Sequence, residues 1–197
     1  MTLPAETRPA VFLDRDGTMI EDVGYLDRLD RVAWFPWTVD AIRALNRAGL
    51  PVVVLTNQSG IARGFFTESF VDETHRHMTA VLAAGGARVD AYYYCPHHPS
   101  GTVSEYARRC DCRKPGRGLV DRAARDLGID PASSFVVGDK WLDVELGRRI
   151  GGRGILVRTG MGAAEEGRAP ADVKADAIVD NLAAAASWIL RNLPAEI

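Results

Sequence analysis

Short apolar runs that end in polar loops recur along this chain. Residues 10–14 (AVFLD), 51–56 (PVVVLT), 134–139 (SFVVGD) and 154–160 (GILVRTG) are apolar without a clear alternation of polar positions. Such runs are typical of strands that are buried on both faces of a sheet. Weaker runs at 89–95 and 175–179 predict two further strands.

Segments with apolar residues at helical spacing lie between these runs. Val39, Ile42 and Leu45 share one face of residues 38–50, and similar patterns predict helices at 67–86, 118–129, 141–152 and 181–193. Strands that alternate with helices imply a parallel sheet with helices on both faces and right-handed crossovers. We therefore expect a Rossmann-like α/β fold, formed as a single domain over residues 1–197.

Composition and charge narrow the classes of function. The chain has 197 residues, of which 47% are hydrophobic and 25% charged, as in ordinary soluble domains. A formal net charge of -2 argues against general nucleic-acid binding, which needs a concentrated basic face. The sequence contains no membrane-length apolar run and begins without a signal-peptide pattern. We expect a cytoplasmic monomer that acts on a small molecule and binds neither nucleic acid nor membrane.

Polar side chains follow three of the predicted strands. Asp14 ends the first run and Asp16 lies two residues on, Thr56 ends the second and Asn57 follows it, and Asp139 ends the run at 134–139, followed by Lys140. The carboxyl ends of parallel strands meet at one edge of a sheet, where ligands bind. Clustered carboxylates repel one another unless a cation neutralises them, and oxygen ligands with a phosphate suit Mg²⁺.

The spacing of these groups suggests phosphoryl transfer. Asp14 at a strand tip is placed to act as an in-line nucleophile that forms an aspartyl-phosphate. Asp16, beyond Arg15 on a loop that Gly17 lets turn, is placed to act as general acid and then general base. Mg²⁺, Lys114 and Thr56 would bind the equatorial oxygens of the phosphoryl group.

All three cysteines lie within residues 95–112, a proline-bearing segment without clear periodicity. A disulfide would leave one thiol over, and the close pair is C-x-C rather than the C-x-x-C of redox sites. Cys95, His97, Cys110 and Cys112 instead form C-x-H…C-x-C, a set that suits tetrahedral Zn²⁺. With four protein ligands and no open position, such a zinc is structural, and we expect it to order the loop that presents Arg113 and Lys114.

The motifs VFLDRDGT, VLTNQSG, CRKP and VVGDKWLD together resemble the four motifs of the haloacid dehalogenase phosphatase superfamily. From Ala10 to about Thr159 the chain is similar to its heptose bisphosphate phosphatases, whose relatives carry the GY, TNQSGIARG and CPHHP elements found here. The resemblance implies a haloacid dehalogenase-like fold without a large cap domain. It also implies an enzyme that removes the C7 phosphate of a heptose 1,7-bisphosphate, a step in the synthesis of nucleotide-activated heptose.

The resemblance also assigns residues. It makes Asp14 the nucleophile and Asp16 the acid/base, with Thr56 and Lys114 stabilising the phosphoryl group. Mg²⁺ would bind Asp14, the backbone carbonyl of Asp16, and Asp139, with Lys140 adjacent. It favours His97 over His98 as the zinc ligand. The residues expected to bind substrate are Asp22, Val23, Gly24, Tyr25, Thr56, Asn57, Gln58, Ser59, Arg113, Lys114 and Lys140.

Several alternatives stay open at this stage. Histidinol-phosphate phosphatase shares the fold and a similar zinc loop, although a shorter span between histidine and C-x-C is typical of it. A non-catalytic zinc-bearing binding module would not explain three carboxylates at strand ends. Asp143 is expected to cap the following helix rather than support the metal. His75 and His77, two apart on a helix, are expected at the surface. The sequence does not indicate which anomer is preferred.

Overall fold

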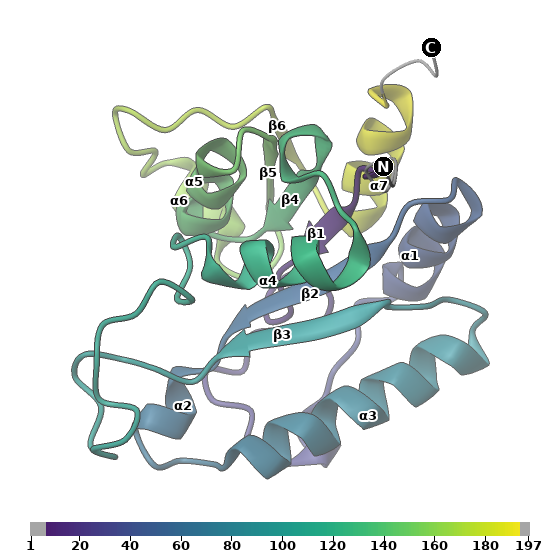
Figure 1. Cartoon of the computed structure of the whole chain (residues 1–197). Helices are drawn as coiled ribbons and strands as arrows, with labels where there is room; N and C mark the ends of the chain where they lie inside the picture. Colours follow the sequence, from purple (N-terminus) through teal and green to yellow (C-terminus); the bar gives the residue numbers. More distant parts are fainter. Residues whose placement is uncertain (1–6, 194–197) are drawn as a thin grey trace, which may run out of the picture.

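A parallel sheet of six strands forms the centre of the molecule (Figure 1). The computed structural model describes residues 7–193. The strand order is β3-β2-β1-β4-β5-β6, and every neighbouring pair is parallel. The strands are β1 (Val11–Leu13), β2 (Val52–Asn57), β3 (Ala91–Cys95), β4 (Phe135–Gly138), β5 (Arg153–Val157) and β6 (Ala177–Val179). The predicted parallel α/β sheet is confirmed, including its two weaker strands.

Helices pack on both faces of this sheet. The core on one face takes side chains from α1 (Thr38–Arg47), α3 (Glu68–Ala84) and α7 (Leu182–Arg191), and the core on the other from α4 (Gly118–Leu127) and α5 (Trp141–Arg149). Successive residues of β1 serve opposite faces, because Val11 and Leu13 belong to the first core and Phe12 to the second. All three are fully buried, which explains why the central strands show no apolar–polar alternation.

Local signals set the ends of several helices. The Thr67 hydroxyl accepts a hydrogen bond from the N–H of Phe70 (3.3 Å) and caps the start of α3. Asn181 does the same for α7 through the N–H of Ala184 (3.0 Å). Gly128, in the left-handed region at φ 63°, ends α4. The short helices α2 (Ser59–Ala62) and α6 (Gly162–Glu166) were not predicted, since neither is long enough to show a period.

The expectation that His75 lies at the surface is wrong. Its exposed fraction is 6%, whereas His77 is exposed. Along α3 the position of His75 falls in the series Val71, Met78 and Leu82, all of them buried. That series faces the sheet, so the helical period carries His75 inward with it.

The chain between β3 and α4 contains no helix or strand over residues 96–117. This segment, drawn in teal in Figure 1, extends away from the sheet as a long loop. It carries three of the four predicted zinc ligands, His97, Cys110 and Cys112, and, close behind them, Arg113 and Lys114, while Cys95 ends β3. Among the described residues, no helix is long and apolar enough to cross a membrane.

Candidate active site

A cleft of about 340 Å³ lies where β1, β2 and β4, adjacent strands of the sheet, reach their carboxyl ends. Its lining residues are Asp14, Asp16, Asp22, Gly24, Tyr25, Thr56, Asn57, Ser59, Arg113, Lys114, Lys140 and Leu142. Two residues expected to line the pocket do not. Val23 packs against the hydrophobic core, and Gln58 is 5% exposed beneath the cleft.

Lys114 lies between two buried carboxylates at the base of the cleft. Its Nζ is 2.8 Å from Oδ1 of Asp14 and 2.6 Å from Oδ1 of Asp143. Burial lowers the pKa of this lysine, but the two carboxylates outweigh it and hold the pKa above its usual value. The ammonium is therefore charged at neutral pH and neutralises part of the acidic cluster.

Asp143 both caps a helix and faces the acidic cluster. Its Oδ2 accepts a hydrogen bond from the N–H of Lys140 (3.3 Å), so Asp143 caps α5 from its third position, whereas the sequence predicted a cap preceding the helix. Its other oxygen pairs with Lys114. Burial raises the pKa of Asp143 to about 6, against the opposing effect of the lysine.

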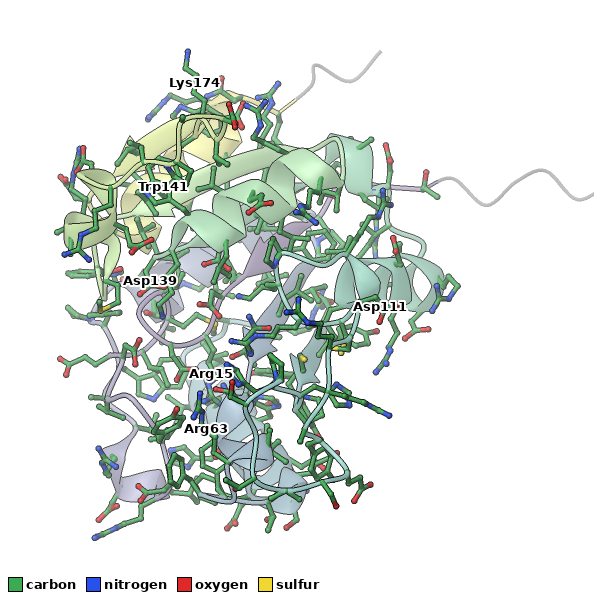
Figure 2. The ribbon with its side chains drawn as sticks, turned by 90° about the vertical axis from the view of Figure 1, so that its left-hand side faces the viewer. Arg15, Arg63, Asp111, Asp139, Trp141 and Lys174 are labelled. Carbon is green, nitrogen blue, oxygen red and sulfur yellow. The ribbon has the colours of Figure 1, made fainter. Side chains whose placement is uncertain are left out.

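Asp139 is completely buried and lies within a tight collar of backbone (Figure 2). The N–H of Met161 donates to its Oδ2 (2.8 Å). A Cβ on Gly17 would lie 2.1 Å from that oxygen and a Cβ on Gly160 2.3 Å, and both glycines have positive φ (83° and 57°). Only glycine fits at these two positions. The loop after β1 and the loop after β5 therefore close on the same carboxylate.

The second oxygen of Asp139 lacks a hydrogen bond. Its Oδ1 is buried and accepts none from the described residues, and the nearest cation, Nζ of Lys140, is 3.6 Å away. Burial and the charge of Asp14 raise the pKa of Asp139 to about 7. Carboxylate oxygens of Asp14, Asp139 and Asp143 lie within 4.8 Å of one another. A divalent cation would supply the missing partner.

Lys140 closes the rim of this cluster. Its Nζ is 3.1 Å from Oδ2 of Asp22, and the Oδ1 of Asp22 accepts from the N–H of Gly24 (2.9 Å). Burial alone would lower the pKa of Lys140, but the charges of Asp139, Asp14 and Asp22 outweigh this effect, so the pKa lies above its usual value. The loop after β1 is thus fastened to the start of α5 across the cleft.

Asp16 points into the cleft and is held from three directions. Its Oδ2 accepts from Nε2 of Gln58 (2.9 Å) and from the hydroxyl of Thr56 (3.4 Å). Gln58 also donates to Thr56 (2.7 Å), which explains why this amide lies below the pocket instead of lining it. The third partner is Arg15, which contacts both carboxylate oxygens.

Asn57 at the end of β2 fixes the backbone of Lys114. Its Oδ1 accepts from the N–H of Lys114 (3.0 Å) and its Nδ2 donates to the carbonyl of the same residue (3.3 Å). Arg113 donates to the carbonyl of His97 (3.4 Å). The two basic residues are therefore tied on one side to the sheet and on the other to the cysteine segment.

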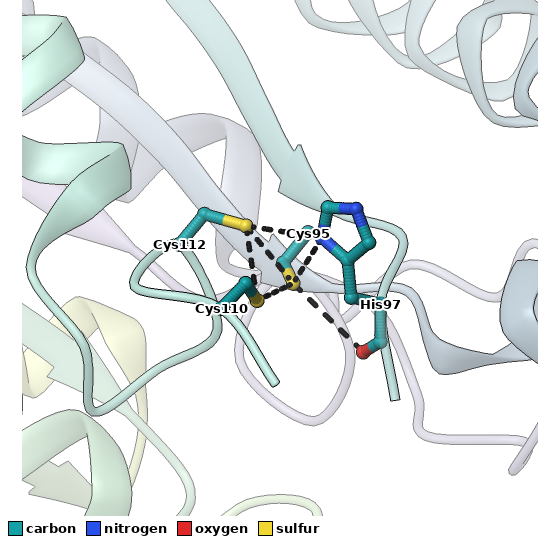
Figure 3. A group of neighbouring side chains, drawn as sticks. All are labelled: Cys95, His97, Cys110 and Cys112. Atoms are coloured by element: carbon teal, nitrogen blue, oxygen red, sulfur yellow. Dashed lines mark hydrogen bonds between the residues drawn. The ribbon is translucent and has the colours of Figure 1, made fainter. Parts of the chain in front are cut away.

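The four predicted zinc ligands form a compact cluster (Figure 3). The Sγ atoms of Cys95, Cys110 and Cys112 are 3.3–3.5 Å apart, and Nδ1 of His97 is 3.4 Å from Sγ of Cys112. These separations exclude a disulfide, whose sulfurs bond at about 2.05 Å. Sulfurs at about 2.3 Å from a tetrahedral zinc lie roughly 3.8 Å apart, so a small outward shift admits the ion.

The cluster already stabilises a thiolate. The contact between Cys112 and Cys95 lowers the pKa of Cys112 to about 5, with Cys110 and His97 adding to the effect, while the pKa of Cys95 and that of Cys110 are raised. A thiolate is the form of cysteine that binds metal. His98 lies outside the group, and its Nδ1 accepts from the N–H of Ser100 (3.1 Å) instead.

Leu142, Asp143 and Arg15 belong to this site without having been predicted there. Leu142 follows Trp141 in a pattern that indicates only a helix. The contact of Asp143 with Lys114 joins positions far apart in the sequence, which no local pattern reveals. The sequence did offer one signal for Arg15, since it stands between the two aspartates predicted to be catalytic.

Two family models match the chain. The model described as polynucleotide kinase 3 phosphatase covers residues 10–146, and the one described as HAD-hydrolase-like covers residues 111–185. The first spans more than half of the chain and includes β1, β2 and β4.

Curated relatives match along most of the chain. The D-glycero-beta-D-manno-heptose-1,7-bisphosphate 7-phosphatase of Yersinia pestis is 44% identical over 174 residues, covering 87% of this chain and 92% of the relative. The enzyme of the same name from Escherichia coli (strain K12) is 42% identical over 178 residues, covering 89% and 93%.

Solved structures show the same fold. The D,D-heptose 1,7-bisphosphate phosphatase from B. bronchiseptica, complexed with magnesium and phosphate, superposes with a TM-score of 0.82 at 33% identity and covers 93% of this chain and 98% of its own. The D,D-heptose 1,7-bisphosphate phosphatase from Burkholderia thailandensis gives a TM-score of 0.68 at 32% identity, covering 93% and 99%.

Proposed function

The chain belongs to the haloacid dehalogenase-like phosphatases, in the family of the heptose-1,7-bisphosphate 7-phosphatases, and we propose that it hydrolyses the C7 phosphate of D-glycero-D-manno-heptose 1,7-bisphosphate. The observation that carries the proposal is the convergence of Asp14, Asp139 and the Lys114–Asp143 pair at adjacent strand ends. The curated relatives are named for the β anomer, and we propose the same preference here.

Asp14 is the nucleophile in this proposal. Its Oδ1 is held by Lys114 and by the N–H of Arg15 (2.8 Å), which orients the carboxylate at the tip of β1. We assign the attack to Oδ2. A bond forms between this oxygen and phosphorus while the bond from phosphorus to the C7 oxygen breaks, leaving an aspartyl-phosphate.

Asp16 moves the proton in both steps. It donates a proton to the departing C7 oxygen and becomes a carboxylate. It then takes a proton from the water that attacks phosphorus, which releases inorganic phosphate and restores Asp14. Lys114 and Thr56 line the cleft beside these groups and neutralise or hydrogen-bond the phosphoryl oxygens.

The acidic cluster suits Mg²⁺. Asp14, the backbone carbonyl of Asp16, and Asp139 would hold the ion, and the Oδ1 of Asp139, which accepts no hydrogen bond from the described residues, supports the place of Asp139 in that set. When bound, the ion neutralises charge on the phosphoryl oxygens during transfer. Because Oδ1 of Asp143 is paired with Lys114, we assign Asp143 to holding the lysine and not to direct coordination.

The cysteine cluster suits a structural zinc. Cys95, His97, Cys110 and Cys112 would fill all four tetrahedral positions and leave none for a reacting water. Arg113 is tied to the carbonyl of His97, so the ion would order the loop that presents Arg113 and Lys114 to the cleft. The cytoplasmic location and the monomeric state stay predictions from the sequence.

A substrate panel tests the proposal. We would measure kcat/KM with Mg²⁺ for both anomers of heptose 1,7-bisphosphate and for histidinol phosphate, with Asp14→Asn as the blank. The β-heptose bisphosphate should give the highest value. A highest value for histidinol phosphate would contradict the substrate assignment, and equal phosphate release by the wild type and Asp14→Asn would contradict the chemistry.

A further inference from the structure

Arg15 is a buried cation beside the catalytic carboxylates. Its side chain is 2% exposed, although it is the longest of the fully buried side chains. It lies inside the molecule, below Asp139 in the view of Figure 2. Its side chain does not line the cleft, whereas Asp14 and Asp16 on either side do. A substrate in the cleft therefore meets the two aspartates but not the guanidinium.

The guanidinium binds the Asp16 carboxylate through its Nε and Nη2 edge. Nε lies 3.2 Å from both oxygens, and Nη2 lies 3.1 Å from Oδ1. Gln58 and Thr56 contact only Oδ2. Those two contacts leave the carboxylate able to pivot about one oxygen, and the second point of attachment from Arg15 fixes its plane.

The other end of the guanidinium rests on His75. Nη1 of Arg15 is 3.5 Å from Nε2 of His75. The imidazole stacks on Tyr92 of β3, with centroids 4.5 Å apart and planes at 19°. Burial, and then the charge of Arg15, lower the pKa of His75 to about 3, so the ring is neutral. Arginine has only donors, so Nε2 accepts and Nδ1 carries the proton.

We infer that Arg15 is a positioning residue, which aligns the Asp16 carboxyl group with the leaving oxygen and is itself supported by the His75–Tyr92 stack. The inference rests on the proposed phosphatase function. A displacement of about 1 Å in a catalytic group costs as much as 10²-fold in rate. An arginine that spans both oxygens restricts such a displacement, and α3 and β3 stand behind it.

Two substrates with different leaving groups separate this role from general support of the fold. A sugar alkoxide needs a proton from Asp16 to leave, whereas an aryl oxide such as that of p-nitrophenyl phosphate leaves without one. The ratio kcat/KM reports the steps up to the first departure. A displaced Asp16 therefore slows the sugar phosphate and spares the aryl phosphate.

The experiment compares the wild type with Arg15→Met, Arg15→Lys and His75→Phe. With heptose 1,7-bisphosphate as the sugar phosphate, we expect Arg15→Met to lower kcat/KM by roughly 10- to 100-fold, with KM changed by less than about threefold. For the aryl phosphate the loss should be several times smaller. Arg15→Lys should recover part of the loss, and His75→Phe should show the same pattern at about 3- to 10-fold.

The matched controls are His77→Phe and Arg47→Met. Both positions are exposed, the first on α3 and the second on α1, and both variants should retain wild-type kinetics. Should Arg15→Met not fold, Arg15→Lys and His75→Phe decide the question by the same ratio.

If the wild type is active and the variants lose activity equally on the two substrates, or keep wild-type kinetics, the positioning role alone is overturned. A wild type inactive on both substrates would overturn the proposed function and this inference with it.

Discussion

The acidic cluster and the cysteine cluster each bring metal-binding atoms within 4.8 Å of one another, but they are held in place differently. Asp14, Asp139 and Asp143 are all buried and follow strands or cap a helix of the central sheet. Of the cysteine cluster only Cys95 belongs to a strand, and the other three ligands lie on a loop without regular structure.

This difference separates two kinds of dependence. The sheet and its backbone collar position the acidic residues whether or not a cation is bound. Backbone hydrogen bonds shape part of the cysteine loop, such as those from the N–H groups of Thr102 and Val103 to the carbonyl of Ala62. The ion would add the bonds that hold the four ligand side chains together. Losing a ligand in the first cluster should therefore lower the activity with little change in stability. Losing one in the second should disorder the loop and lower the stability.

The largest expected effect tests the acidic side of the comparison. Asp14→Asn should lower kcat by roughly 10³-fold or more, because the amide cannot form the aspartyl-phosphate. Its melting temperature should stay close to that of the wild type, since the change also removes one charge from a repulsive cluster. A variant that kept a tenth of the activity, or that unfolded, would break the contrast.

A smaller effect tests the cysteine side. Cys112→Ser should lose bound zinc and lower the melting temperature by about 5–10 °C, which corresponds to roughly 2–3 kcal/mol. Activity should fall by about tenfold through disorder of Arg113 and Lys114. Elemental analysis and thermal unfolding measure these changes.

His97→Ala and His98→Ala form the matched pair for that measurement. The first should release zinc and the second should retain it, because only His97 belongs to the cluster. Full zinc content and wild-type turnover in Cys112→Ser would contradict the coupling between this loop and the cleft.

The smallest effect concerns the pH dependence of magnesium binding. The folded pKa of Asp139 is about 7, above the ordinary 3.8, so the folded protein binds more protons than the unfolded chain between these values. The free energy of unfolding of the metal-free protein should then fall as pH rises from about 4 to 7.

Magnesium binds the deprotonated carboxylate of Asp139, so its binding offsets the fall in the free energy of unfolding at higher pH. At one fixed Mg²⁺ concentration, the gain in melting temperature should be larger at pH 8 than at pH 6, by about 2–4 °C. Asp139→Asn should abolish the difference. A gain that was equal at both pH values in the wild type would show that Asp139 does not titrate with the metal.

The sequence predicted those features that depend on local patterns. The buried strands appear as apolar runs, and their polar ends converge because parallel strands finish at one edge. The cysteine spacing predicted a cluster that the fold does bring together. Each of these requires only knowledge of the chain near the residue concerned.

Features that depend on packing between distant segments were missed. The burial of His75 follows from the exact phase of α3 against the sheet, and spacing from His77 does not give that phase. Gln58 was expected in the pocket, but its hydrogen bonds to Thr56 and Asp16 hold its side chain beneath the cleft. The pairing of Lys114 with Asp143 joins a loop to a helix start and has no local signature.

The collar around Asp139 joins the beginning of the chain to its last third, through Gly17 on one side and Gly160 with Met161 on the other. If Asp14 is the nucleophile and Asp139 a metal ligand, as proposed, a growing polypeptide contains the first long before the loop that encloses the second has emerged after β5. Such an unfinished chain would not complete the proposed magnesium site, so the proposed hydrolysis would depend on synthesis through Met161.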